Sequence, residues 1–350
     1  MKALLITIAT ISSIINTISG HGVMVIPHNW LDYKQWVKTR SHGFVYEYVG
    51  MKSQQQCLPG MFFPRDLACK DYNNCAGFIE PTAACMWFTN YTFIQEPTLD
   101  PELWTYPHVK DPSMVKYNPW RSPGAAPINS PCGAAGGNPD GCLGGPYCGQ
   151  MKGGFAYGPR LKDLDLSSHH KAYVTNWTRG EAVEVAWGIR ANHGGGYSYR
   201  LCKMPKEGRK ALTEECFQQT PLRFVGDKQW VQYGEDESTR YEFTAARTDN
   251  GTTPPGSQWT RNPIPPCNGF AGGINEDHPC KNGTQFPAPG PGLEGFGVKF
   301  KNILWTFEFV IIDMLHIPED VEPGEYVVSF RWDGEQFPQV WNMCSSVWLN

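Results

Sequence analysis

Two segments decide the fold class: Ala182-Val-Glu-Val-Ala-Trp-Gly-Ile189 and Tyr326-Val-Val-Ser-Phe-Arg-Trp332. Both combine β-branched and aromatic residues in a partly alternating pattern, which is typical of strands packed on one face. The second segment follows the turn signal Glu322-Pro-Gly324. An apolar run over residues 305–312 and the short Tyr173-Val-Thr175 predict two further strands.

Long loops separate these strands. Residues 119–158 and 251–297 are rich in Gly and Pro, and the whole chain of 350 residues has 37 Gly and 29 Pro. Such residues break helices, so we expect only short helices, around residues 32–39 and 213–219. The pattern predicts an all-β fold: an immunoglobulin or fibronectin III-like β-sandwich with large loop insertions, in which residues 21–350 form a single domain.

Composition excludes several classes of function. With 41% hydrophobic and 18% charged residues the chain can form a folded core. The net charge of -4, from 30 basic and 34 acidic residues, gives no basic surface for nucleic acid or an anionic membrane. We expect a monomer with neither of those partners.

The N-terminal residues predict export. Met1 and Lys2 precede an apolar stretch over residues 3–15, and Ser19-Gly20 supply a small-residue end, although Ile18 is larger than usual near a cleavage site. The pattern predicts a signal peptide over residues 1–20 and a secreted, extracellular protein that begins at His21. A membrane anchor is the alternative, but the apolar run is shorter than the roughly 20 residues that span a bilayer.

The cysteines agree with an oxidising compartment. All 12 follow residue 20, and they predict disulfides that pin the long loops, without fixing which cysteines pair. Four glycosylation sequons, at Asn90, Asn176, Asn250 and Asn282, are compatible with a secreted glycoprotein.

His21 is the first candidate metal ligand. Cleavage before it would give one residue two nitrogen donors, the ring Nδ1 and an α-amine with an ordinary pKa of about 7.7–8.0. Nitrogen donors in a planar arrangement suit Cu(II). His193 lies in Ala191-Asn-His-Gly-Gly-Gly-Tyr197, directly after a predicted strand, where a surface metal site could receive a third nitrogen.

The other histidines are more typical of solvent-exposed or locally hydrogen-bonded side chains, and a histidine can also stand at position 21 by chance. His28 is kept as a weak alternative ligand because it is near His21 in sequence. The remaining histidines are His42, His108, His169, His170, His278 and His316.

Four features together resemble the lytic polysaccharide monooxygenases, secreted copper enzymes on a β-sandwich that are also described as chitin-binding type-4 domains. The features are the predicted cleavage before His21-Gly22, the Ala191-x-His193-Gly194 segment, the strand Gly324-Glu-Tyr-Val-Val-Ser-Phe-Arg-Trp332, and the ending Gln339-Val-Trp-Asn-Met-Cys344. They span nearly all of the chain after residue 20.

The resemblance implies that His21 and His193 form a histidine brace around one copper ion. It also implies a hydrogen-bonding role for Gln339, and it places Ala191 and Trp341 at the two axial faces of the metal. Trp341 departs from the family, which has Tyr or Phe there, and its indole N–H is a donor that cannot ligate copper. An ordinary core aromatic near a disulfide is the equally weighted interpretation of Trp341.

The implied function is oxidative cleavage of glycosidic bonds in an insoluble polysaccharide, chitin or cellulose, with an external reductant and hydrogen peroxide or dioxygen. Arg331 and Glu335 are candidates to steer the reaction near copper, although a surface ion pair is the favoured interpretation of these two residues.

A non-catalytic carbohydrate-binding or cell-wall adhesion protein on the same sandwich is the main alternative. The sequence has no G-x-S-x-G nucleophile elbow and no H-E-x-x-H motif, which argues against an esterase and a zinc protease.

Overall fold

The computed structural model describes most of the C-terminal half of the chain and parts of the N-terminal half. The described residues are 21–30, 34–39, 43–48, 56–58, 61–62, 89–98, 116–128, 130–133, 160–163, 174–233, 236–268, 280, 283–295, 306–307, 309–336 and 338–350. The predicted signal peptide, residues 1–20, lies outside them.

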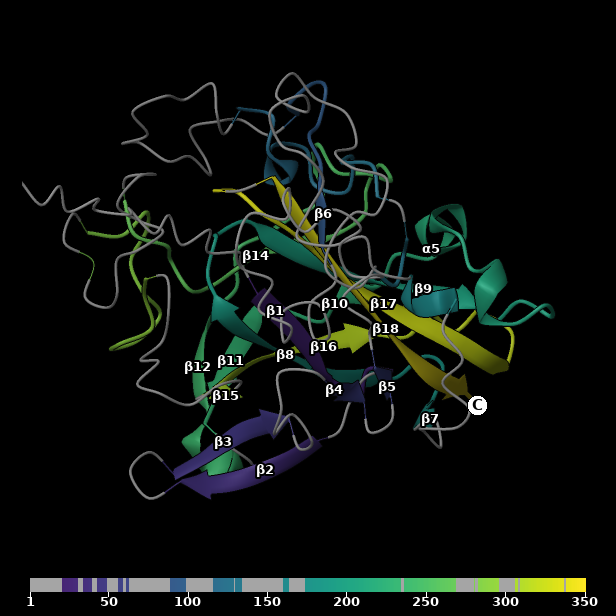
Figure 1. Cartoon of the computed structure of the whole chain (residues 1–350), viewed down its shortest axis with the longest axis horizontal. Helices are drawn as coiled ribbons and strands as arrows, with labels where there is room; N and C mark the ends of the chain where they lie inside the picture. Colours follow the sequence, from purple (N-terminus) through teal and green to yellow (C-terminus); the bar gives the residue numbers. More distant parts are fainter. Residues whose placement is uncertain are drawn as a thin grey trace, which may run out of the picture.

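Two larger sheets dominate the described residues (Figure 1). The first sheet has six strands in the order β1-β8-β16-β11-β12, with β10 also paired to β16. Its strands are β1 (His21–Ile26), β8 (Ala182–Ala191), β16 (Val310–His316), β11 (Lys228–Gln232), β12 (Tyr241–Thr244) and β10 (Arg223–Phe224).

The second sheet has seven strands, six of them in the order β13-β14-β9-β17-β18-β6. The seventh, β7, pairs in parallel with the C-terminal end of β18, whereas β6 pairs with the N-terminal end of that strand. Its strands are β13 (Arg247–Thr248), β14 (Trp259–Arg261), β9 (Gly196–Lys203), β17 (Gly324–Asp333), β18 (Gln339–Leu349), β6 (Thr89–Tyr91) and β7 (Val174–Trp177). Apart from β7, the strands of both sheets pair in antiparallel fashion.

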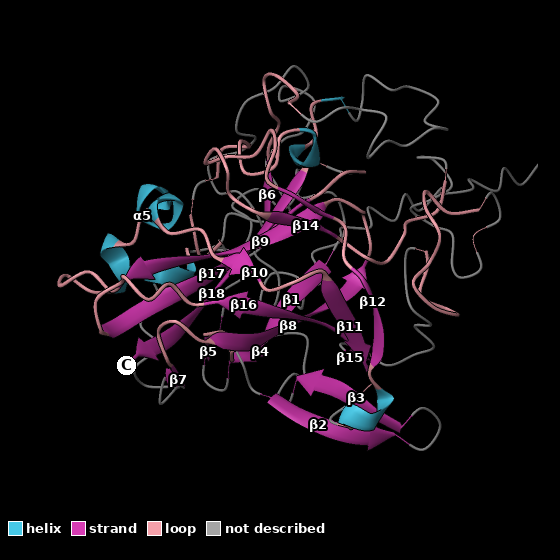
Figure 2. Ribbon diagram, turned by 180° about the vertical axis from the view of Figure 1, so that it is seen from behind, coloured by secondary structure: helices cyan, strands magenta, loops and turns pink. Residues whose placement is uncertain are grey.

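Smaller elements complete the described structure. They are the three-stranded sheet of β2 (Lys34–Thr39), β3 (Gly43–Tyr48) and β15 (Thr306–Phe307), the pair β4 (Gln56–Leu58) and β5 (Met61–Phe62), the helix α5 (Glu214–Gln219), and the 3-10 turns η1 (Pro119–Arg121), η2 (Leu161–Asp163), η3 (Arg209–Ala211) and η4 (Glu237–Thr239). Figure 2 shows α5 alongside β9 and β17. Within the described residues, no helix is long and apolar enough to cross a membrane.

The predicted strands at residues 182–189, 326–332 and 173–175 are confirmed as β8, β17 and β7. The single strand predicted over residues 305–312 is confirmed only in part, because residues 306–307 form β15 in the three-stranded sheet and β16 begins at Val310 and continues to His316. The predicted helix at residues 213–219 is also confirmed as α5, and the Thr213 hydroxyl caps its first turn by accepting from the Cys216 amide. The helix predicted at residues 32–39 is wrong, because residues 34–39 form β2 and pair with β3 from Lys34↔Tyr48 to Thr39↔Gly43.

The inner faces of the two sheets meet in one aromatic core, which makes the molecule an all-β sandwich. The second sheet contributes a row in which Trp341 pairs with Trp332 and Trp332 pairs with Tyr197. Trp187 of β8 lies against this row, with ring centroids 4.7 Å from Tyr197 and 5.3 Å from Trp332. All four rings are buried. Such tilted aromatic pairs contribute beyond the area that they bury.

Over residues 327–333 of β17 and 340–346 of β18, the outer face of the second sheet is also buried. Residues 116–128 and 130–133, here called the covering segment, lie over it: the Gly124 amide donates to Asp333 Oδ2 (2.9 Å) and Ser329 Oγ donates to the Pro131 carbonyl (2.8 Å). The disulfide Cys132–Cys344 joins the same segment to β18. The face therefore carries polar groups that the covering segment removes from water.

Disulfides pin described loops, as the sequence predicts. Besides Cys132–Cys344, the structure has Cys202–Cys216, which joins β9 to α5, and Cys267–Cys280. The side chains of the other six cysteines lie outside the described residues; these are Cys57, Cys69, Cys75, Cys85, Cys142 and Cys148.

Candidate metal-binding site

β1 brings the backbone of His21 to the strand that leads into His193. His21 pairs with Ala191, and Gly22 pairs with Ile189 across an irregularity in the register. Ala191 ends β8 and stands two residues before His193. The two candidate ligands therefore lie at one end of the first sheet. The side chains of His21 and Ala191 are outside the described set.

Gly22 packs against an indole that the sequence analysis did not select. A Cβ atom at Gly22 would lie 2.8 Å from two ring carbons of Trp332 and 3.2 Å from the ring of Trp187. Only glycine fits this approach without moving the rings. The Trp332 Nε1 also donates to the carbonyl of Gly194 (2.8 Å). A single side chain thus fixes both segments that carry the candidate histidines.

Asn192 also fixes the turn that carries His193, through hydrogen bonds of its side chain. This buried amide donates to the carbonyls of Ile264 (2.8 Å) and Gly295 (3.1 Å), and its oxygen accepts from the Gly194 amide (2.9 Å) and from Asn262 Nδ2 (2.8 Å). All four of its hydrogen-bonding positions face the protein. The turn is consequently fixed before any ligand binds.

His193 is buried at the centre of this arrangement. Its side chain is 1% exposed, and its carbonyl accepts from the amides of Glu335 (3.2 Å) and Gln336 (2.9 Å). Burial lowers the pKa of His193 to about 3, and a hydrogen bond with the Gln336 side chain acts in the opposite direction. The imidazole is neutral near pH 7, which is the form that binds metals. The exposed position expected from the sequence is corrected to a buried one.

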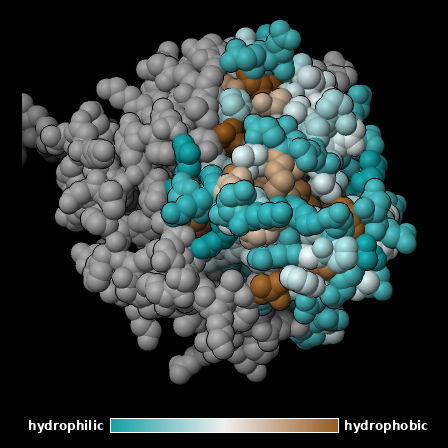
Figure 3. All heavy atoms as spheres, turned by 90° about the vertical axis from the view of Figure 1, so that its right-hand side faces the viewer, coloured by the Kyte–Doolittle hydropathy of each residue, from teal (hydrophilic) through white to brown (hydrophobic). Residues whose placement is uncertain are grey.

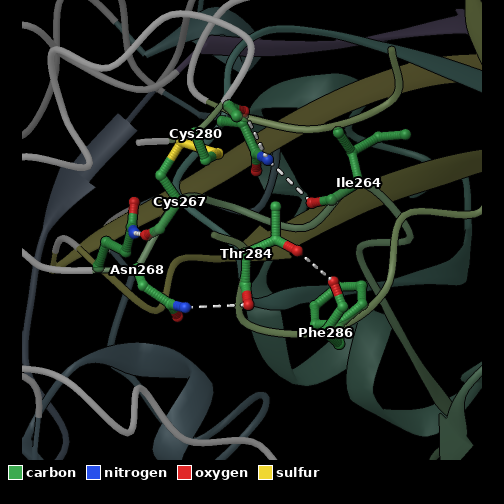
Figure 4. The surroundings of a disulfide bond; sticks show 9 residues. Ile264, Cys267, Asn268, Cys280, Thr284 and Phe286 are labelled. Atoms are coloured by element: carbon green, nitrogen blue, oxygen red, sulfur yellow. Dashed lines mark hydrogen bonds between the residues drawn. A yellow bond between two sulfur atoms is a disulfide. The ribbon is translucent and has the colours of Figure 1, made fainter. Parts of the chain in front are cut away.

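A disulfide-bonded loop supports Gln336. Gln336 Nε2 donates to the carbonyl of Cys267 (3.3 Å), and Cys267 pairs with Cys280. Figure 4 shows how the loop is closed: Asn268 donates to the carbonyl of Thr284 (3.1 Å), and the Thr284 hydroxyl donates to the carbonyl of Phe286 (2.7 Å). The loop thereby connects a disulfide to the side chain that contacts His193.

Trp341 and Gln339 lie at the same end of the sandwich, on the first residues of β18. Trp341 is 2% exposed and stacks on Trp332, with ring centroids 6.3 Å apart and planes inclined by 30°. Gln339 is fully buried, and its carbonyl accepts from the Gly334 amide (2.8 Å). The structure gives Trp341 a core position beside the indole that contacts Gly22. Its axial role stays a prediction.

The surface ion pair between Arg331 and Glu335 is wrong. Arg331 is 1% exposed and binds Asp333 through Nε (2.7 Å), while Glu335 is 3% exposed and pairs with Arg121 (3.3 Å). Burial raises the pKa of Glu335 to about 7, and the charge of Arg121 opposes this. Both residues are buried in separate ion pairs, because the covering segment lies above them.

His28 is placed away from the candidate site. It follows the opposite end of β1, where its carbonyl accepts from the hydroxyl of Ser345. Among the described side chains, no group of three or more His, Cys, Asp or Glu is arranged to hold a metal ion.

Three residues that hold the candidate site were not predicted from the sequence: Asn192, Trp332 and Gln336. Asn192 stood unassigned inside the histidine motif, where its position between a strand and a glycine turn was a usable signal. The roles of the other two depend on the register of β17 and on the loop after it.

No family model and no curated protein matches the chain. The solved structures that it resembles include the Cu(I) state of an AA15 lytic polysaccharide monooxygenase from Thermobia domestica, with 13% identity over 51% of this chain and 64% of that chain and a TM-score of 0.25. A chitin-binding domain from Burkholderia pseudomallei matches with 10% identity over 51% of this chain and 57% of that chain, at a TM-score of 0.24.

The cellulose-active lytic polysaccharide monooxygenase CelS2, in complex with copper, matches with 12% identity over 50% of this chain and 53% of that chain, at a TM-score of 0.21. This chain thus spans between 53% and 64% of the length of the three structures. The likeness is distant and concerns the fold alone.

Proposed function

We propose that the chain, after cleavage before His21, binds one copper ion through the α-amine and ring of His21 and the ring of His193. The observation that carries this proposal is the pairing of His21 with Ala191, which sets the two histidines at one end of the first sheet. The chemistry of the donor set fits copper, because a free amine and neutral imidazoles are nitrogen ligands that Cu(II) prefers.

The residues around the histidines would hold the ligands in place. Trp332 contacts Gly22 and binds the Gly194 carbonyl, so that a displacement of either segment would disturb the other. The side chain of Gln336 interacts with that of His193 and would help to orient its ring. Partners that fix ligand orientation in this way strengthen metal binding.

The reaction that we propose for this site is oxidative cleavage of an insoluble β-linked polysaccharide, with chitin ahead of cellulose as the substrate. Copper, when bound, supplies the redox chemistry that activates hydrogen peroxide or dioxygen against a C–H bond beside the glycosidic linkage. The chain's own part is to present a rigid nitrogen donor set. Gln339 and Trp341 would border it from β18.

Copper titration by calorimetry tests the metal site. Protein that begins at His21 should bind one Cu(II) tightly, and His193→Ala should weaken binding by more than about 100-fold. His28→Ala is the matched control and should bind as the parent protein does. A form with one extra residue before His21 loses the free amine at that position. Unchanged affinity in that form would overturn the proposed donor set.

The activity needs a second experiment. Copper-loaded protein, given a reductant and hydrogen peroxide, should release oxidised oligosaccharides from a panel of chitin and cellulose, identified by mass spectrometry. Absence of oxidised products from every glycan, with one copper bound, would instead favour a non-catalytic carbohydrate-binding protein.

A further inference from the structure

The outer face of the second sheet ends in an exposed tryptophan next to an exposed asparagine. Trp348, near the end of β18, is 44% exposed. Its partner across the parallel pairing of β7 and β18 is Asn176. Residues directly paired in a sheet project from the same face, and neighbouring strands are about 5 Å apart. The Asn176 amide and the Trp348 indole therefore leave the sheet side by side.

Asn176 belongs to the sequon Asn176-Trp177-Thr178. Asn176 and Thr178 are exposed, whereas Trp177 between them points into the core and is 5% exposed. Val174, two residues earlier on the same face of β7, is 44% exposed. The asparagine is thus flanked by two apolar side chains that the protein leaves in water.

The surrounding surface is polar. Figure 3 faces the side of the molecule where β7 lies and β18 ends, and its described surface is largely hydrophilic with small hydrophobic islands. An indole that is 44% exposed in such a surface leaves much of its apolar area in water. Further along the same face of β18, Ser346 accepts from the indole of Trp30 (3.0 Å), so that this part of the strand is covered.

The other described sequons differ from this one. In Asn250-Gly-Thr252 the threonine is 6% exposed, and its hydroxyl donates to the carbonyl of Ser257 (2.8 Å). In Asn90-Tyr-Thr92 the threonine is fully buried. The asparagine of the fourth sequon, Asn282, lies outside the described residues. Among the sequons described, Asn176-Trp-Thr178 is the one whose asparagine and threonine both face solvent.

We propose that Asn176 carries an N-linked glycan whose first sugar covers the indole of Trp348. In the transfer step, Asn176 Nδ2 forms a bond to the anomeric carbon of a lipid-linked oligosaccharyl diphosphate. The bond between that carbon and the diphosphate oxygen breaks, the diphosphate leaves with the electron pair, and the amide releases one proton. No redox change occurs. The proposal rests on export through a glycosylating secretory pathway and is independent of the copper site.

The contact has a physical basis. The C–H face of a pyranose is apolar and can lie flat on an aromatic ring, so that both surfaces leave water together. The covalent link holds the sugar beside the ring and removes most of the entropy cost of bringing the two together. Glycosylation is therefore expected to stabilise the fold through Trp348, and not only to decorate the surface.

The first experiment measures occupancy. The full chain is secreted from a eukaryotic host, treated with an amidase that releases N-glycans, and mapped by peptide mass spectrometry, where conversion of asparagine to aspartate marks an occupied site. We expect conversion at Asn176 in most molecules and its loss in Thr178→Ala, which leaves Asn176 and Trp348 unchanged. Secreted protein without conversion at Asn176 would overturn the proposal.

The second experiment tests the contact with the indole by a double-mutant cycle of melting temperatures. Glycosylated parent protein should melt about 2 °C above Thr178→Ala. In a Trp348→Ser background the same pair should differ by less than half of that amount. Asn250→Gln is the matched control at a second sequon and should leave the cycle unchanged. An equal shift in both backgrounds would mean that the glycan does not use Trp348.

Discussion

Along residues 327–333 of β17, both faces of the second sheet are buried, but they are held by different forces. Its inner face presents aromatic rings, among them Trp332, Trp341 and Tyr197, to the first sheet. Its outer face presents Arg331 and Asp333 to the covering segment, and these side chains are 1% and 0% exposed. Successive side chains of β17 therefore point alternately into an apolar interior and into a charged one.

The two faces should therefore respond differently to substitution, because one is held by apolar packing and the other by ion pairs. Burial of apolar surface is non-directional, so a ring of similar size can replace another at modest cost. A buried ion pair is directional, and removal of one partner leaves the other charge desolvated and uncompensated. The comparison predicts that the outer face tolerates substitution less well than the inner face, although both faces lie on the same strand.

Removing Arg331 should have the largest effect. Its guanidinium binds Asp333 through two nitrogens (2.7 and 3.1 Å), Glu214 (3.3 Å) and the carbonyl of Ala126 (2.9 Å). Arg331→Met keeps the stem and deletes the charge, which should lower the free energy of unfolding by about 3–5 kcal/mol. Urea denaturation measures this loss.

The exposed pair Arg223–Asp249 offers a control, since each side chain is 56% exposed. Arg223→Met should cost no more than about 1 kcal/mol. If the two variants lose similar free energy, the distinction between a buried and an exposed ion pair does not hold here.

Asp313 is an ionisable residue among the aromatic rings between the two sheets. It therefore tests how the apolar interior responds to a charge. It is fully buried on β16, accepts from the Tyr197 hydroxyl (2.5 Å) and pairs with Arg247 (3.2 Å). Burial raises its pKa from 3.8 to about 6, even though these partners lower it. The folded state therefore keeps a proton that the unfolded chain has already lost.

Because the pKa of Asp313 differs between the folded and unfolded states, the free energy of unfolding depends on pH. The contribution of Asp313 to stability is most favourable below about pH 4 and falls as pH rises through 6, by about 3 kcal/mol in total. In Asp313→Asn this dependence disappears, so the free energy of unfolding of the variant, minus that of the parent, should increase from pH 4 to pH 7. Urea unfolding across this range measures the difference, and a flat difference would contradict the raised pKa.

Trp332→Phe, which removes the indole N–H donor, should lower the free energy of unfolding by a smaller amount. Trp332→Phe keeps an aromatic ring against Trp187 and Gly22 but leaves the carbonyl of Gly194 without the bond from Nε1. An unsatisfied buried carbonyl costs about 1–3 kcal/mol. Calorimetry should also show weaker copper binding, because the turn that carries His193 is loosened. Parent-like copper affinity in a destabilised variant would restrict Trp332 to packing.

Trp341→Phe should give the smallest effect. Phenylalanine retains the stacking on Trp332 and neither residue can ligate copper, so the cost should stay below about 1.5 kcal/mol. The electron paramagnetic resonance spectrum of copper-loaded protein should remain close to that of the parent. A large spectral change would show that Trp341 acts on the metal in a way that packing does not explain.

Much of the sandwich follows from local sequence, because β8 and β17 carry alternating apolar and aromatic residues that suit a sheet buried on one face. The error at residues 34–39 has a physical cause. β2 is stabilised by pairing with β3, and such pairing overrides weak local preferences. Short segments without a strong pattern depend on partners that local sequence does not specify.

The candidate site was less accessible to prediction. His21 and His193 were selected from residue type and position, and their role as metal ligands stays a prediction. Trp332, in contrast, looks like any core aromatic until the register places it at Gly22. Arg331 alternates outward from the sandwich core, which normally indicates solvent. Its burial depends on the covering segment, about 200 residues earlier in the chain, and no local pattern reveals that contact.

The disulfide Cys132–Cys344 has a consequence for the covalent topology of the molecule. It closes a ring with a sequence separation of 212 residues, which contains β7 to β17 and just over half of β18. A protease that cuts the ring once opens it without dividing the protein, since the two new ends remain joined through the sulfur atoms. The two ends of a nicked molecule would stay covalently joined until a thiol reached either sulfur of this disulfide, and both cysteines are fully buried.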